Sequence, residues 1–146
     1  SWNLINKFPH STFVWEGLDG SRVLTHFPPA DTYNAHVTVE QSLFEVKNFK
    51  NKDASKDSLM VFGHGDGGGG PQMEMLERMR RLKDVDGLPR IEPRSPKQFF
   101  DRVKKQIDDL PVWIGELYFE LHRGTYTTHG YVKWANRKCE FLLREI

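Results

Sequence analysis

Two runs of β-branched and aromatic residues, 12–17 and 21–27, lie on either side of the tripeptide Leu18-Asp19-Gly20. Asp-Gly is favoured in a two-residue type I′ turn, because both central residues of that turn need positive φ. The pattern therefore predicts a β-hairpin. Pro28 and Pro29 follow and predict its end, because proline cannot donate to a strand ladder.

Three helices are predicted in the middle of the chain. Thr38 with Gln41, and Ser95 with Gln98, form capping boxes in which a hydroxyl precedes a glutamine by three residues. Pro71 suits the first position of the remaining helix. The apolar residues at helical spacing behind these signals are Val39, Leu43, Val46 and Phe49, then Met75, Leu76, Met79 and Leu82, then Phe99, Val103 and Ile107.

Short apolar runs at 59–62 and 88–92 predict strands between these helices, and strict alternation over 113–122 predicts another. Strands that alternate with helices favour an α/β architecture with parallel strands. The last apolar residues step by three and four, as in the seam of a helix bundle; they are Val132, Ala135, Cys139, Leu142 and Ile146. Because this seam still runs at the last residue, we expect the chain to be a segment of a larger protein.

The composition of the chain argues against two classes of binding partner, nucleic acids and membranes. The 146 residues include 21 Lys and Arg against 20 Asp and Glu, so the net charge is +1, without the basic excess typical of nucleic-acid binding. No apolar run approaches the roughly 18 residues of a membrane span. We therefore expect neither a nucleic-acid nor a membrane partner. A single cysteine, Cys139, and histidines without ligand spacing indicate no metal site in this segment.

The loop Gly63–Gly70 is the most unusual local feature. Gly63, Gly65 and Gly68 satisfy G-x-G-x-x-G, and Glu92 stands near the position of a ribose-binding acid, so a nucleotide-binding α/β module is one interpretation. Against it, Asp66 would place a carboxylate where the pyrophosphate should collect helix N–H groups. A flexible structural turn, or a loop that presents Asp66 or His64 to a substrate, are the other interpretations that the residues leave open.

Longer strings point to one family. Residues 1–29, the string Phe62-Gly-His-Gly-Asp-Gly-Gly-Gly-Gly-Pro71 and residues 115–128 resemble, in this order, the retaining α-mannosidases of glycoside hydrolase family 38. The resemblance is to the cytosolic and fungal-vacuolar branch. It implies a seven-stranded α/β barrel that runs into a three-helix bundle. On that pattern residues 1–128 are the C-terminal part of the catalytic domain, and 129–146 begin the helical middle domain.

The resemblance also implies site residues. The family's acid/base aspartate follows a strand in a glycine-containing setting, which here is Gly63-His-Gly-Asp66, so Asp66 is the expected catalytic residue. Residues implied to bind the sugar are Tyr33, Asn34, His122, Arg123 and Tyr126. Golgi and lysosomal relatives carry Asp where Asn34 stands, and relatives carry an aromatic residue about where His122 stands.

The family binds one zinc through an N-terminal His-x-Asp, the nucleophilic aspartate and a distant histidine, and none of these motifs occurs here. The zinc ligands are therefore expected outside this segment, which we expect to be inactive alone. The resemblance implies an enzyme that hydrolyses α-linked mannose from oligosaccharides. It also implies that this segment packs with the rest of the same polypeptide and that the enzyme is a homo-oligomer. The implied compartment is the cytoplasm, or alternatively the vacuolar lumen.

Overall fold

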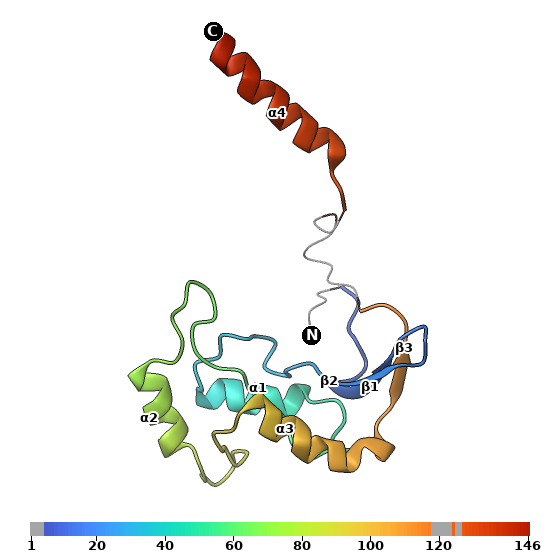
Figure 1. Ribbon diagram of the computed structural model, residues 1–146. Helices are drawn as coiled ribbons and strands as arrows, with labels where there is room; N and C mark the ends of the chain where they lie inside the picture. Colours follow the sequence, from blue (N-terminus) through green and yellow to red (C-terminus); the bar gives the residue numbers. More distant parts are fainter. Residues whose placement is uncertain (1–4, 118–123, 125–126) are drawn as a thin grey trace.

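The computed structural model describes residues 5–117, 124 and 127–146 (Figure 1). Figure 1 shows the sheet at one end of the main body and α2 at the other, with α1 and α3 between them. The elements in chain order are β1 (Thr12–Glu16), β2 (Arg22–His26), α1 (Val39–Asn48), α2 (Met73–Arg81), α3 (Pro96–Val103), the 3₁₀-helix η1 (Lys104–Asp109), β3 (Val112–Ile114) and α4 (Gly130–Glu145).

β1 is the middle strand of a three-stranded sheet with the order β2-β1-β3. β2 is antiparallel to β1, with Thr12 opposite His26, and this confirms the predicted hairpin. β3 runs parallel to β1. The predicted two-residue turn is wrong: the loop runs from Gly17 to Ser21, and of the Asp-Gly pair only Gly20 has positive φ. Asp19 instead accepts a hydrogen bond from the Ser21 N–H at 3.0 Å, so its side chain stabilises a wider loop.

Both capping boxes are confirmed. The Thr38 hydroxyl accepts from the Gln41 N–H at 3.2 Å at the start of α1. The Ser95 hydroxyl accepts from the Gln98 N–H at 3.3 Å at the start of α3. α2 begins at Met73, two residues later than predicted, because Gln72 is its N-cap and Pro71 lies before the helix.

The core lies on both faces of β1, because successive strand residues point to opposite sides. Val14 packs with Leu110 and with the α3 residues Phe99 and Val103. Phe13 is fully buried on the other face, in a cluster of aromatic rings. Its members are Phe8, Phe27 and Trp113, with ring centroids 4.7 to 5.3 Å apart.

α1 does not bury the face that its sequence pattern predicts. Its buried residues are Ser42 and Glu45, whereas Val39, Leu43 and Val46 are 41 to 47% exposed. The polar side chains are buried at little cost because each has a hydrogen-bond partner. The Ser42 hydroxyl donates to the Thr38 carbonyl at 2.9 Å, and Glu45 accepts from the Ser58 hydroxyl at 2.6 Å.

Two predicted strands are wrong. Residues 59–62 form no strand and pair only through one parallel bridge, Ala35 to Phe62, and residues 88–92 form no strand. Of the alternating stretch 113–122, β3 covers only the beginning, and residues 118–122 lie outside the described part of the chain.

The helix predicted from the apolar seam near the C-terminal end is confirmed as α4, and none of its residues is buried. Figure 1 shows α4 extending away from the main body. Among the helices of the described ranges, none combines the length and apolar character that crossing a bilayer requires.

Candidate active site

The glycine-rich segment forms a closed loop between residues 64 and 70, drawn in green above α2 in Figure 1. The His64 N–H donates to the Gly70 carbonyl at 2.9 Å, and the Gly70 N–H returns a bond to the His64 carbonyl at 2.7 Å. Asp66 lies inside this loop and is exposed. The backbone bonds therefore fix the base of the loop and leave the carboxyl accessible to a ligand.

A second segment runs beside the loop. The Ala35 N–H donates to the Val61 carbonyl at 3.1 Å, and the Gly63 N–H donates to the Ala35 carbonyl at 3.0 Å. These bonds form the parallel bridge between Ala35 and Phe62. Since Asn34 directly precedes Ala35, the bridge places the predicted sugar-binding pair next to the loop.

The structure brings three of the predicted site residues together. The Tyr33 hydroxyl donates to Asp66 Oδ2 at 2.9 Å. The Gly65 N–H donates to Asn34 Oδ1 at 2.6 Å, one residue before Asp66. The hydrogen bond to the Asp66 carboxylate raises the pKa of Tyr33, so this phenol stays protonated as a donor.

Close approach makes glycine necessary at position 65. A Cβ added there would lie 2.8 Å from Asn34 Oδ1 and 3.0 Å from the Tyr33 ring. Gly67 and Gly68 differ, because a Cβ at either would meet nothing within 4 Å, while both have φ of +74°. There the backbone conformation, rather than space, disfavours an L side chain.

Two histidines border the site. The rings of His36 and His64 make an edge-to-face contact with centroids 5.4 Å apart. The backbone of His36 is held on both sides, since its N–H donates to Gln41 Oε1 at 2.8 Å and its carbonyl accepts from Arg78 Nη1 at 3.2 Å. The sequence analysis did not predict His36 as part of this site. Its position two residues after Asn34 indicates that it lies near the loop only once the bridge at Ala35 is known.

The arrangement is suited to proton transfer. Tyr33 occupies Oδ2 of Asp66, which leaves Oδ1 as the oxygen that can carry and deliver a proton. The exposed position of Asp66 allows a substrate oxygen to come within hydrogen-bond reach.

The remaining predicted sugar-binding residues, His122, Arg123 and Tyr126, lie outside the described residues. Within 5–117, 124 and 127–146, no three His, Cys, Asp or Glu side chains come together as metal ligands. The described side chains therefore offer zinc no ligand set.

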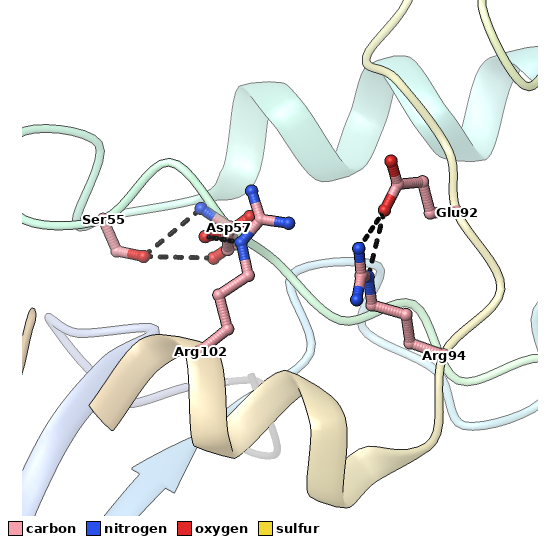
Figure 2. Close-up of polar contacts among 5 residues, drawn as sticks. All are labelled: Ser55, Asp57, Glu92, Arg94 and Arg102. Carbon is pink, nitrogen blue, oxygen red and sulfur yellow. Dashed lines mark hydrogen bonds and ion pairs between the residues drawn. The ribbon is translucent and has the colours of Figure 1, made fainter. Parts of the chain in front are cut away.

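A cavity lies away from Asp66. It has a volume of about 450 Å³ between α1, α3 and the segments 52–62 and 89–94, and its lining does not include Asp66. Figure 2 shows two ion pairs there: Arg102 Nε donates to Asp57 Oδ2 at 2.9 Å, and Arg94 Nε donates to Glu92 Oε2 at 3.0 Å. The hydrogen bond from Arg94 lowers the pKa of Glu92.

The nucleotide-binding interpretation receives no support from this geometry. The acid that it requires, Glu92, is paired with Arg94 (Figure 2). The glycine loop follows a single bridge rather than a strand, and α2 begins only at Met73, after Gln72. A dinucleotide site needs the loop to pass directly from a strand into a helix N-terminus.

Comparison with known proteins gives consistent matches. Alpha-mannosidase 2C1 of Homo sapiens is 52% identical over 146 residues, which is all of this chain and 14% of that protein. Alpha-mannosidase G of Dictyostelium discoideum is 54% identical over 143 residues, 98% of this chain and 13% of that protein. Alpha-mannosidase of Saccharomyces cerevisiae is 43% identical over 155 residues, covering all of this chain and 14% of that protein.

The chain thus spans about one seventh of the length of the curated relatives that it matches. The family model described as glycosyl hydrolases family 38 N-terminal domain matches residues 1–116, which include β1 to β3 and the whole Asp66 loop. This match covers most of the chain, and the alignments with the relatives extend over 98 to 100% of it. The chain belongs to glycosyl hydrolase family 38.

Proposed function

We propose that the complete polypeptide is a zinc-dependent, retaining α-mannosidase that hydrolyses α-linked mannose from oligosaccharides. The proposal is supported by family membership and by relatives whose names are all alpha-mannosidase. The observation that carries it to a site is the carboxyl of Asp66, exposed on a closed loop with one oxygen held by the Tyr33 hydroxyl.

In the first step we assign to Asp66 the role of general acid. Its Oδ1 proton passes to the glycosidic oxygen while the bond between that oxygen and the mannose C1 breaks. A carboxylate from another part of the polypeptide forms the new bond to C1, as a retaining mechanism requires. The leaving alcohol departs neutral, and Asp66 is left ionised, with Oδ2 stabilised by Tyr33.

In the second step Asp66 acts as general base. Its carboxylate takes a proton from a water molecule whose oxygen bonds to C1, and the glycosyl–carboxylate bond breaks. Asp66 is again protonated and ready for another turnover. A bound zinc ion would supply polarisation of the sugar hydroxyls, with ligands from outside this chain.

Asn34 keeps the loop in register, because it accepts from the N–H of Gly65, the residue before Asp66. We propose that Tyr33 and Asn34 also face the mannose, together with His122, Arg123 and Tyr126. In the complete polypeptide, residues 1–128 would belong to a seven-stranded α/β barrel, and 129–146 would begin a three-helix bundle. We place the enzyme in the cytoplasm, with the vacuolar lumen as the alternative.

The deciding experiment is leaving-group dependence in the complete enzyme carrying Asp66→Asn. We expect kcat for mannobiose, whose leaving group needs a proton, to fall by about 10²- to 10⁴-fold. For 2,4-dinitrophenyl α-mannoside, whose leaving group departs unprotonated, we expect a loss of about tenfold or less in the glycosylation step. The measurement is steady-state and single-turnover kinetics on both substrates.

The matched control is Asp86→Asn, which alters an exposed aspartate in the turn after α2. It should leave both rates unchanged. Equal losses of the glycosylation rate on the two substrates in Asp66→Asn would remove Asp66 from the acid role. Absence of mannosidase activity in the unaltered complete polypeptide would remove the proposed function itself.

A further inference from the structure

His26 is a largely buried histidine at the end of β2, and it joins three parts of the fold. Its ring packs edge-on against Phe99 of α3, with centroids 4.8 Å apart, and lies 6.3 Å from the ring of Phe49 at the end of α1. Its Nδ1 lies 2.9 Å from the Thr12 hydroxyl of β1. Its Nε2 accepts from the Leu59 N–H at 3.3 Å.

These two contacts define the state of the ring. A backbone N–H can only donate, so Nε2 must hold a lone pair, and the imidazole proton is therefore on Nδ1. Nδ1–H then donates to the Thr12 hydroxyl. The ring is neutral in this arrangement, and burial lowers the pKa of His26 to about 4, which favours the same state.

Leu59 begins the extended segment that leads to the candidate acid. Three residues later Phe62 forms the bridge to Ala35, and the loop with Asp66 follows. The residue before Leu59 is held as well, since the Ser58 hydroxyl donates to Glu45 Oε1 of α1 at 2.6 Å. The start of this segment is thus fixed from β2 and from α1 at adjacent positions.

We propose that His26 is a positioning residue for Asp66: as a neutral acceptor for the Leu59 N–H, it anchors the segment that sets the glycine loop against Tyr33. The inference rests on the proposed role of Asp66. Mispositioning a proton donor by about 1 Å can lower the rate by about 10²-fold. Loss of a contact that holds the segment before the loop can therefore lower the catalytic rate.

Protonation of His26 would remove this anchor. An imidazolium has two donors and cannot accept from Leu59, and its charge would be placed among two phenylalanine rings. Several charged groups on the elements around the ring are engaged with other residues: Glu45 of α1 with Ser58, Asp57 of the 55–62 segment with Arg102 of α3, and Glu16 of β1 with Arg22 of β2.

The test compares two substitutions in the complete enzyme. His26→Leu removes the acceptor, whereas His26→Gln places an amide oxygen near the position of Nε2 and does not titrate. The matched control is His10→Gln, which replaces another partly buried histidine whose ring contacts Phe8 and Phe13 instead. The readouts are kcat and KM on mannobiose and 2,4-dinitrophenyl α-mannoside, and amide hydrogen exchange in residues 58–63.

We expect His26→Leu to lower kcat on mannobiose by about 10- to 100-fold, with KM and the single-turnover glycosylation rate on the dinitrophenyl substrate nearly unchanged. Amide exchange in residues 58–63 should be at least about tenfold faster. His26→Gln should recover both properties to within about threefold of the unaltered enzyme, and His10→Gln should change neither. Equal losses of the glycosylation rate on both substrates, or unchanged exchange in His26→Leu, would overturn the proposal.

If His26→Leu does not fold, the pH dependence of exchange in His26→Gln decides. In the unaltered enzyme the protection of residues 58–63 should fall between about pH 6 and about pH 4, and the glutamine variant should keep it. Parallel loss in both would overturn the proposal. Asp66→Asn is measured alongside: failure of its leaving-group effect refutes the proposed acid role of Asp66, whereas its success without an effect of His26→Leu refutes only the positioning role.

Discussion

Tyr33 and Asp66 are 33 positions apart in the sequence, and the phenol of one donates to the carboxylate of the other at 2.9 Å. The contact depends on the bridge between Ala35 and Phe62, which aligns the segments that carry the two side chains. It fixes which carboxyl oxygen is free to exchange a proton. The proposed chemistry therefore depends on a residue that does not itself transfer the proton.

Tyr33→Phe in the complete enzyme should lower kcat on mannobiose by about tenfold, the effect of one hydrogen bond to a charged group. The ring remains, so packing beside Gly65 is preserved. Steady-state kinetics on mannobiose and the dinitrophenyl substrate measure the effect. A rate on mannobiose equal to that of the unaltered enzyme would show that the phenol does not orient Asp66.

Gly65→Ala should lower kcat by about 10²-fold, because its Cβ would lie 2.8 Å from Asn34 Oδ1 and displace the loop. The free energy of unfolding should change by only about 0.5 kcal/mol, since the loop is exposed. Gly130→Ala is the control, because nothing lies within 4 Å of its added Cβ. Kinetics and urea denaturation separate the two effects, and an unaltered kcat in Gly65→Ala would contradict the close packing.

Acidification should destabilise the fold through His26. Its pKa falls from 6.5 in the unfolded chain to about 4 in the folded chain, so the unfolded chain binds more protons between these values. The stabilisation is complete above about pH 6.5 and is lost as pH falls through 4, about 3 kcal/mol in all. The measurement is the free energy of unfolding of the chain across this range, and His26→Gln should flatten the profile.

Glu45 should act in the opposite direction. Burial raises its pKa, so the folded chain holds the proton more tightly than the unfolded chain does, and stability falls as pH rises through the raised value. Glu45→Gln should remove that loss, since its amide oxygen can still accept from the Ser58 hydroxyl. Urea denaturation near neutral pH should therefore show equal or higher stability, and a clear loss would mean that the carboxylate charge is needed.

The 146-residue chain alone should neither hydrolyse an aryl α-mannoside nor hold stoichiometric zinc. In the described residues no metal-ligand group forms, and the proposed nucleophile belongs to another part of the polypeptide. Elemental analysis of the purified chain and a p-nitrophenyl α-mannoside assay test this. Turnover, or one zinc per chain, would place the missing chemistry inside this segment.

Local signals predicted the parts of the fold that depend on local contacts. The boxes at Thr38 and Ser95 specify helix starts through bonds between residues three apart, and both helices begin where the boxes place them. The hairpin is of the same kind, because its strands are neighbours in sequence. Its loop was less predictable, since Asp19 can stabilise a wide loop through Ser21 as well as a tight turn.

Periodicity failed where burial depends on distant segments. In α1 the apolar residues are partly exposed, while Glu45 is buried because Ser58, from a different segment, satisfies its carboxylate. The pattern of apolar positions within α1 contains no information about a hydrogen-bond partner from another segment, so it could not predict that Glu45 is buried. Similarly, the apolar run 59–62 predicted a short buried strand, but none of its residues is buried and Val61 is exposed. Strand pairing also requires a neighbour at the right register, and here only one bridge forms.

The candidate site also has a part that the sequence predicted and a part that depends on distant segments. Asp66 could be identified from its glycine setting and the resemblance of the surrounding strings, and Tyr33 and Asn34 from that resemblance alone. Their contacts, and the neighbouring His36, depend on one bridge between segments about 30 residues apart, which spacing does not encode. His26 was not predicted as part of this arrangement, because its effect passes through the backbone of Leu59.

At Gly67 and Gly68 the chirality of a substituted residue, rather than the size of its side chain, decides whether the loop can accept it. Each has φ of +74° with open space where a Cβ would be. A φ of +74° is the mirror image of a φ that L-residues readily adopt, so a D-alanine introduced there by chemical ligation would suit this φ, and an L-alanine would not. A D-residue would also restrict the unfolded chain, so the loop beside Asp66 could be stiffened without adding a contact.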